Sequence, residues 1–93
     1  MEIRIYGKDG CGLCEAAKEK MKRLGTAFRY YDLEDFDEEW KGTGKVEAMA
    51  WHSSEETLPI FRVDGDFMLY PQAMKLIKQR KKNERALAAA NGA

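Results

Sequence analysis

The segment that decides the fold reads Ile3-Arg4-Ile5-Tyr6-Gly7-Lys8-Asp9-Gly10-Cys11-Gly12-Leu13-Cys14. Apolar side chains at Ile3 and Ile5 predict a short strand over residues 2–6. Residues 7–10 read as a loop, and from about residue 12 to 24 apolar side chains recur every three or four residues, which predicts a helix. The two cysteines of the chain therefore lie where a strand has ended and a helix begins.

This position suggests a chemistry for the cysteines. Unpaired backbone N–H groups and the helix dipole stabilise negative charge at a helix start. The thiolate is the nucleophilic form of cysteine, so Cys11 should be reactive near neutral pH, and Lys8 adds a positive charge nearby. Cys14 lies one turn further, on the inward face of the helix. We predict an exposed attacking thiol and a sheltered resolving thiol that carry out thiol–disulfide exchange.

Two other interpretations of the cysteines stay open. A structural zinc site needs about four ligands, whereas the chain offers two cysteines and a single histidine, His52, so we expect no metal site. Two inert buried thiols are also conceivable, although a Gly-Cys-Gly helix start is an unusual place to bury one. In a reducing compartment, a close cysteine pair in this context favours redox catalysis.

Bulk properties indicate a single domain over residues 1–93. The formal net charge is zero, which gives no global field to attract nucleic acid or a membrane. The N-terminus lacks a basic segment followed by an apolar one, and no apolar run approaches the length of a membrane span. We therefore expect a cytoplasmic, monomeric protein.

The remaining elements follow from apolar patterns and turn residues. Strands are predicted over 27–33, 59–63 and 66–70, and residues 37–53 are predicted to be partly helical with an interruption at 42–44. Val46, Met49 and Ala50 would give that second helix its inward face. Asp64-Gly65 reads as a hairpin turn, and Pro71 suits the first position of a last helix, which residues 83–93 either extend or leave frayed.

The predicted order is strand, helix, strand, helix, strand, strand, helix. A helix joins the first two strands, so they should be parallel with a right-handed crossover, whereas the last two form an antiparallel hairpin. The sequence therefore predicts an α/β fold, with a mixed four-stranded sheet and helices on both faces.

Two charged runs interrupt the overall neutrality. The acidic run consists of Asp32, Glu34, Asp35, Asp37, Glu38 and Glu39, and the basic run of Lys75, Lys78, Arg80, Lys81 and Lys82. We interpret both as solvated faces. Docking of a charged partner protein is one alternative. Nucleic-acid or phosphate binding by the basic run is another, and it would weaken steeply with salt.

At this point the chain resembles the glutaredoxin branch of the thioredoxin-fold family. The residues that carry the resemblance are Ile5 to Cys14 with Lys18, Thr57-Leu58-Pro59-Ile60-Phe61, and Val63-Asp64-Gly65-Asp66. As a set they cover roughly residues 2–80. The resemblance implies a thioredoxin-like fold and a cytoplasmic disulfide oxidoreductase, active on protein disulfides or glutathione mixed disulfides.

The resemblance also implies site residues. The Leu58–Pro59 peptide bond would be cis, placing the Leu58 backbone beside the cysteines to pair with an extended substrate. Glutathione would be a co-substrate rather than a bound cofactor. Lys8 would face its glycine carboxylate, and Thr57 with Leu58 would hold its cysteinyl backbone. Leu13 and Pro59 complete the expected substrate site.

One departure from the family pattern keeps other functions open. Glutathione-binding glutaredoxins usually carry Gly-Gly and then Asp after the last strand, whereas this chain has Phe67-Met68-Leu69-Tyr70-Pro71-Gln72. Gln72, at a helix N-terminus, would substitute for that motif in part. The alternatives are an electron donor to ribonucleotide reductase driven by thioredoxin reductase, and a homodimer holding an iron–sulfur cluster, for which Gly12 leaves room. Anaerobically purified protein would absorb visible light if it held the cluster, and a lack of absorption would exclude this alternative.

Overall fold

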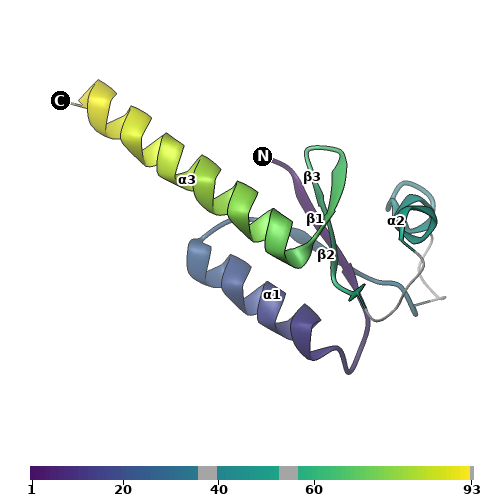
Figure 1. The fold of residues 1–93 in the computed structure, drawn as a ribbon. Coiled ribbons are helices and arrows are strands. Elements are labelled where there is room, and N and C mark those ends of the chain that lie inside the picture. The colour runs from purple at the N-terminus through teal and green to yellow at the C-terminus, as the bar shows by residue number, and fades with distance from the viewer. Residues whose placement is uncertain (36–39, 53–56, 93) are drawn as a thin grey trace.

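The computed structural model describes residues 1–35, 40–52 and 57–92, with the backbone alone for 87–92 (Figure 1). Its elements are β1 (Ile3–Gly7), α1 (Gly12–Leu24), β2 (Arg29–Asp32), α2 (Lys45–Trp51), β3 (Ile60–Val63), β4 (Asp66–Leu69) and α3 (Tyr70–Gly92). The sheet order is β2-β1-β3-β4. β1 and β2 are parallel, and the other two pairs are antiparallel. The predicted element order and mixed sheet are confirmed.

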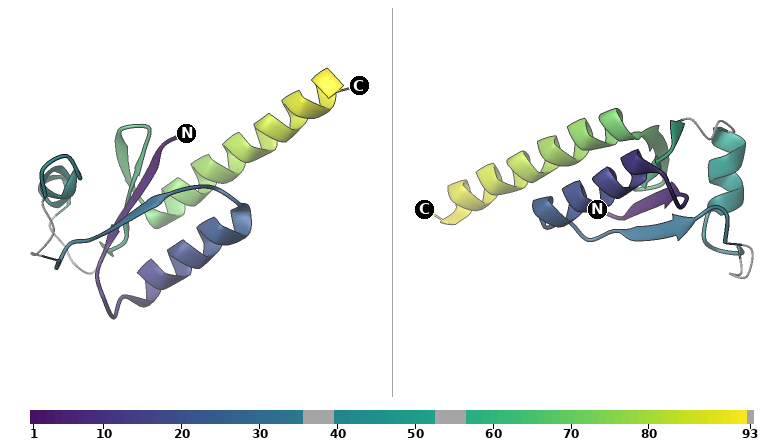
Figure 2. Two further views of the ribbon diagram at one scale, coloured as in Figure 1. Left: turned by 180° about the vertical axis from the view of Figure 1, so that it is seen from behind. Right: turned by 90° about the horizontal axis from the view of Figure 1, so that it is seen from below.

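The helices cover both faces of the sheet. In both views of Figure 2, α1 and α3 lie side by side on one face, and α2 lies apart from them. Under α1 and α3 the core consists of Ile3, Ile5, Ala17, Met21, Phe61, Val63, Ala73, Met74 and Ile77. A second cluster contains Tyr6, Cys14, Leu33, Ala48, Leu58 and Ile60. Alternate residues of β1 thus belong to different clusters, which is the period-two pattern of a strand with both faces covered.

The predicted strands 27–33, 59–63 and 66–70 are all shorter in the structure, where the last ends at Leu69, and the first strand covers Ile3–Gly7 rather than residues 2–6. β2 pairs with β1 only from Arg29 opposite Arg4 to Asp32 opposite Gly7. β1 ends at Gly7, and the backbone N–H of Leu33 still donates to the Gly7 carbonyl at 2.8 Å. β3 begins at Ile60 rather than Pro59, because proline has no N–H to donate to the ladder.

The predicted inward face of α2 is wrong. Val46 and Met49 are 59% and 40% exposed, and Ala50 is exposed as well. The buried residues of α2 are Lys45 and Ala48. Lys45 tolerates burial because its Nζ donates to the backbone carbonyl of Asp35 at 3.4 Å and lies 5.2 Å from the centre of the Trp40 ring.

A tyrosine of β1 fixes the approach to α2. The buried hydroxyl of Tyr6 donates to the carbonyl of Thr43 at 2.7 Å, two residues before α2 starts. Gly42 and Gly44 have φ of +81° and +83°, a backbone region that favours glycine. The predicted interruption at 42–44 is thus a turn that precedes α2. The predicted helix positions at 37–39 lie outside the described residues, as do Asp37, Glu38 and Glu39 of the acidic run.

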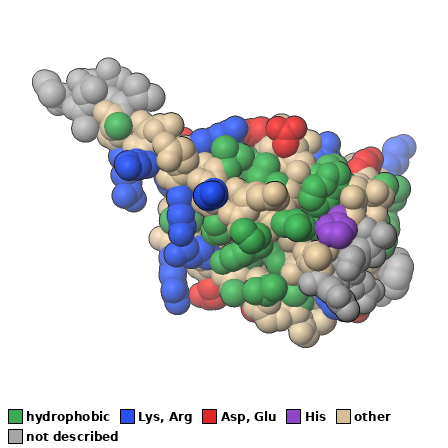
Figure 3. Space-filling model, in the orientation of Figure 1, with side chains coloured by type: hydrophobic (Ala, Val, Ile, Leu, Met, Phe, Trp, Pro, Cys, Tyr) green, Lys and Arg blue, Asp and Glu red, His purple; other side chains and the backbone are tan. Residues whose placement is uncertain are grey.

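The last helix is long. α3 begins at Tyr70, one residue before Pro71, and continues to Gly92, so the alanine-rich end extends the helix. Its last buried described side chain is Ile77, and beyond it α3 projects from the rest of the chain (Figure 1). Figure 3 shows Lys and Arg side chains gathered where α3 leaves the domain. No helix among the described residues is long and apolar enough to cross a membrane.

The Asp64-Gly65 turn links the hairpin to the N-terminal residues and to α3. Asp64 and Gly65 have φ of +49° and +90°, as a two-residue hairpin with an Asp-Gly turn requires. The Asp64 carboxylate accepts a hydrogen bond from the backbone N–H of Glu2 at 2.8 Å and a second from the Arg80 guanidinium. These contacts, the Glu2 N–H first, hold the pKa of Asp64 below its ordinary value.

This lowered pKa predicts a pH dependence of stability. A carboxyl group with a lower pKa in the folded chain stabilises it at higher pH and loses that effect as pH falls through the folded pKa. Between about pH 5 and 2, the free energy of unfolding should fall more steeply in the wild type than in Asp64→Asn. Urea unfolding across this range checks it, and equal slopes would contradict the assignment.

Candidate active site

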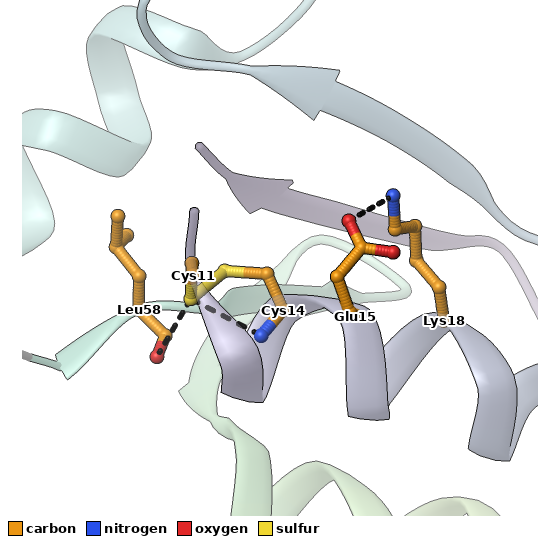
Figure 4. The surroundings of a disulfide bond; sticks show 5 residues. All are labelled: Cys11, Cys14, Glu15, Lys18 and Leu58. Carbon is orange, nitrogen blue, oxygen red and sulfur yellow. Dashed lines mark hydrogen bonds and ion pairs between the residues drawn. A yellow bond between two sulfur atoms is a disulfide. The ribbon is translucent and has the colours of Figure 1, made fainter. Parts of the chain in front are cut away.

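The start of α1 is built around Cys11. Cys11 is the N-cap residue, with extended backbone angles φ −89° and ψ 105°, and its Sγ accepts the backbone N–H of Cys14 at 3.1 Å. A side-chain acceptor at the N-cap satisfies one of the N–H groups that a helix start leaves unpaired. Cys11 and Cys14 form a disulfide, with 5.2 Å between their Cα atoms (Figure 4). The helix ends at Gly25, which has φ +66° and bonds back to Lys22 and Met21, so the predicted stop is confirmed.

The two sulfurs have different surroundings. Cys14 has an exposed fraction of 0% and belongs to the core cluster with Tyr6 and Leu58. Cys11 is partly exposed at the edge of that cluster. The predicted contrast between an accessible and a sheltered cysteine is therefore present. A molecule in solution can therefore reach Cys11, whereas Cys14 is closed to solvent.

The segment before β3 lies against the cysteines. The Leu58–Pro59 peptide bond is cis, as the resemblance implied. The carbonyl oxygen of Leu58 lies 3.9 Å from Cys11 Sγ (Figure 4). The Leu58 side chain and Pro59 are buried. The chain therefore presents a backbone carbonyl beside the accessible sulfur.

The sequence analysis considered His52 only as a possible metal ligand, and the structure connects it to the predicted substrate segment. His52 Nε2 and Thr57 Oγ1 are 2.7 Å apart, and the His52 ring meets the Trp51 ring edge-on at 5.6 Å. Thr57 is one residue before Leu58, so His52 steadies the approach to the cis bond. The only sequence signal for this contact was the position of His52 at the end of the predicted second helix, a few residues before Thr57.

The other predicted site residues have different positions. Leu13 is 57% exposed between the cysteines, so it offers an apolar surface beside them. Lys8 is half-buried in the loop before Cys11. Gln72 lies in the first turn of α3, where its Oε1 accepts the backbone N–H of Leu69 at 3.1 Å. That oxygen is thus engaged in a local contact at the start of the helix.

A charged pair flanks the buried cysteine. Lys18 Nζ lies 2.8 Å from a Glu15 carboxylate oxygen (Figure 4) and 4.2 Å from the centre of the Tyr30 ring. The hydrogen bond with Glu15 raises the pKa of Lys18, and burial raises the pKa of Tyr30. Both groups therefore keep their protons at neutral pH. Sequence reasoning did not single out Tyr30, although a tyrosine on the strand next to β1 is in reach of α1.

The geometry describes a dithiol at a helix start, with one accessible sulfur and a backbone carbonyl beside it. The glutaredoxin family profile matches residues 3–68, a span from β1 into β4 that includes both cysteines. The chain belongs to the glutaredoxin family. It is accordingly a thiol–disulfide oxidoreductase of that family with a Cys-x-x-Cys dithiol at Cys11 and Cys14.

Solved structures share the fold of this glutaredoxin-family chain at low identity. The thioredoxin-like protein BC3987 is 21% identical over 82% of this chain and 96% of its own, with a TM-score of 0.60. The glutaredoxin grx-1 of Archaeoglobus fulgidus is 22% identical over 81% and 84%, with a TM-score of 0.58. A buckwheat glutaredoxin solved in complex with glutathione is 22% identical over 85% and 70%, with a TM-score of 0.57. No curated protein matches the chain closely enough to count as a relative.

Proposed function

We propose that this chain reduces protein disulfides and glutathione mixed disulfides, and that glutathione returns it to the dithiol form. One observation carries the proposal: the partly exposed sulfur of Cys11 accepts the Cys14 N–H at 3.1 Å and lies 3.9 Å from the Leu58 carbonyl. An N–H aimed at a sulfur favours the thiolate over the thiol. The reactive atom and a strand-like docking backbone are therefore adjacent.

The reaction proceeds by two exchanges. The Cys11 thiolate attacks one sulfur of the substrate disulfide, forms a mixed disulfide and releases the other sulfur as a thiolate, which takes up a proton. Cys14 then loses its proton and attacks Cys11 Sγ, which releases the second substrate thiol and leaves the Cys11–Cys14 disulfide. Two glutathione molecules reduce that disulfide through a glutathione mixed disulfide on Cys11 and leave as glutathione disulfide.

The backbone beside Cys11 would orient the substrate. An extended chain can pair with an exposed backbone edge in strand fashion, and the Leu58 carbonyl near Cys11 Sγ is an acceptor for such a partner. We assign the cysteinyl backbone of glutathione to Thr57 and Leu58, next to Pro59. Since His52 holds the Thr57 hydroxyl at 2.7 Å, this segment is steadied before substrate arrives.

The ends of glutathione would meet Lys8 and Gln72. The ammonium of Lys8, three residues before Cys11, complements a glycine carboxylate, and Leu13 adds apolar contact from its exposed position. Gln72 lies in the first turn of α3, and the N-terminus of a helix suits the γ-glutamyl carboxylate. The buckwheat glutaredoxin with glutathione supports glutathione as the ligand class.

A test of this proposal compares electron sources. Reduction of a cysteine–glutathione mixed disulfide and of insulin is followed by NADPH consumption, once with glutathione and glutathione reductase and once with thioredoxin reductase. We expect turnover with glutathione and glutathione reductase to be at least about tenfold faster than turnover with thioredoxin reductase. Lys8→Gln should raise the KM for glutathione several-fold at similar kcat, because it removes one charge contact in binding. Turnover with neither source would overturn the assigned function.

One observation favours a second source of electrons. The Gln72 Oε1 atom is already engaged by the Leu69 N–H, and the chain lacks the Gly-Gly-Asp sequence expected beside it. A weaker γ-glutamyl site would leave the Cys11–Cys14 disulfide to thioredoxin reductase, with ribonucleotide reductase as a candidate acceptor. Faster turnover with thioredoxin reductase in the same assay would select this alternative.

A further inference from the structure

The hydroxyl of Tyr30 lies beside the sulfur of Cys14. Tyr30 pairs with Ile5 in the sheet, so it faces the same side as Ile5 and Gly7. A Cβ atom added to Gly7 would lie 2.5 Å from Tyr30 Oη and 2.7 Å from Cys14 Sγ. The two atoms therefore lie no more than 5.2 Å apart, on the side of the sheet where Gly7 has no side chain.

The surroundings make Tyr30 a hydrogen-bond donor. Burial raises its pKa, so the phenol keeps its proton and can donate it to a neighbouring anion. Lys18, held by Glu15, lies 4.2 Å from the ring centre, and a cation over the ring draws electron density from the hydroxyl. The carboxylates of Asp9, Glu15 and Asp32 act on Tyr30 in the opposite sense. Among these charged groups, Lys18 has the largest effect on the pKa of Tyr30.

Cys14 needs such a donor. Its side chain has no exposure to solvent, and a buried anion is costly unless a polar group meets it. In the oxidised chain the Cys14 sulfur is bonded to Cys11. When that bond is open, the sulfur must carry negative charge in order to attack, and Tyr30 Oη is a polar atom no more than 5.2 Å from it.

We propose that the Tyr30 hydroxyl donates a hydrogen bond to the Cys14 sulfur once the dithiol is open, and that this bond promotes the second exchange. The proposal rests on the resolving role of Cys14 proposed above. In the step, the Cys14 thiol ionises, its thiolate attacks Cys11 Sγ, and the substrate sulfur departs as a thiolate that takes up a proton. Tyr30 keeps its own proton throughout.

The expected size of the effect follows from thiol chemistry. A hydrogen bond to a charged group shifts an ionisation by about one to two pH units. A lower pKa gives more thiolate at neutral pH but also a weaker nucleophile. The loss in nucleophilicity cancels about half of the gain in thiolate on a logarithmic scale. At neutral pH, Tyr30 should therefore speed the Cys14 step by about three- to tenfold.

Ellman's reagent, 5,5′-dithiobis(2-nitrobenzoate), separates the two steps in one trace. Attack by Cys11 releases a first coloured thiolate at a rate proportional to the reagent concentration. Attack by Cys14 on the resulting mixed disulfide releases a second at a rate independent of that concentration. Stopped-flow traces of the reduced chain are recorded for the wild type, Tyr30→Phe and Tyr31→Phe across a range of pH.

Tyr30→Phe keeps the ring under Lys18 and removes only the hydroxyl. It should slow the second phase about three- to tenfold and move its pH midpoint upward by about one to two units, with the first phase changed less than about twofold. Tyr31→Phe is the matched control, because the Tyr31 ring stacks on Tyr6 at 5.5 Å from the neighbouring position. It should leave both phases unchanged.

Three outcomes would overturn the proposal: an unchanged second phase in Tyr30→Phe, equal slowing of both phases, or a lower rate with no shift in pH midpoint. The last two would indicate a structural effect. The experiment contains no glutathione, so a failure of glutathione use leaves it unaffected. An unreactive Cys11, visible as a missing first phase in the wild type, would instead overturn the proposed function and this inference together.

Discussion

Cys11→Ser will abolish reduction of every disulfide substrate. A serine hydroxyl is not ionised near neutral pH, and oxygen does not replace sulfur as the attacking atom in thiol–disulfide exchange. The hydroxyl can still accept the Cys14 N–H as an N-cap, so the fold should persist. We expect turnover to fall at least about a thousandfold, to the level of the uncatalysed exchange, with a far-UV circular dichroism spectrum like that of the wild type.

Cys14→Ser is the matched variant for the same assay. It keeps the accessible sulfur of Cys11 and removes the buried one, so a mixed disulfide can form but cannot be closed internally. Reduction of insulin should be lost, whereas a cysteine–glutathione mixed disulfide should still turn over, because free glutathione can resolve Cys11. Retained insulin reduction in Cys14→Ser, or any substantial turnover by Cys11→Ser, would contradict the assigned roles.

Gly7→Ala should produce the largest loss of stability among conservative changes near the dithiol. The added Cβ would lie 2.7 Å from Cys14 Sγ and 3.1 Å from Cys14 Cβ, closer than atoms in a packed core approach. Cys14 is wholly buried, so the sulfur cannot move outward without displacing the start of α1. Overpacking of this kind costs about 1–3 kcal/mol.

The control for this change lies in the same segment. A Cβ at Gly12 would meet nothing within 4 Å, and Gly12 is the first residue of α1. Gly12→Ala should therefore leave the free energy of unfolding unchanged or raise it by up to about 1 kcal/mol. Urea unfolding of the oxidised chain compares the two variants. Equal stability of Gly7→Ala and the wild type would show that the chain relaxes around Cys14.

The sequence was sufficient for features that depend on local pattern. The order of elements, the Asp64-Gly65 turn and the end of α1 at Gly25 all follow from period, glycine and turn chemistry, and all three are present. The burial contrast between Cys11 and Cys14 followed from the helical period alone. The cis bond at Pro59 came from family resemblance, because an isolated X–Pro sequence does not determine its isomer.

Features that depend on tertiary contact were missed. Val46 and Met49 are apolar at helical spacing, yet α2 turns Lys45 and Ala48 inward. The reason is the Tyr6 hydroxyl bond to Thr43, which sets how the chain enters α2 and is not visible in the pattern of α2 itself. The contacts of His52 with Thr57 and of Tyr30 with Lys18 were not predicted either. Each joins residues that are not neighbours on one helix or strand, so the apolar periodicity carries no signal for it.

The hydrogen bond between the Cys14 N–H and Cys11 Sγ makes folding and electron transfer thermodynamically linked. The same sulfur that exchanges electrons also caps α1, so each oxidation state offers the helix a different acceptor. Any ligand or substitution that tightens the first turn of α1 must favour the state with the stronger acceptor, the thiolate, and by reciprocity reduction must tighten that turn. The first turn of α1 therefore acts as a local reporter of the redox state of the protein.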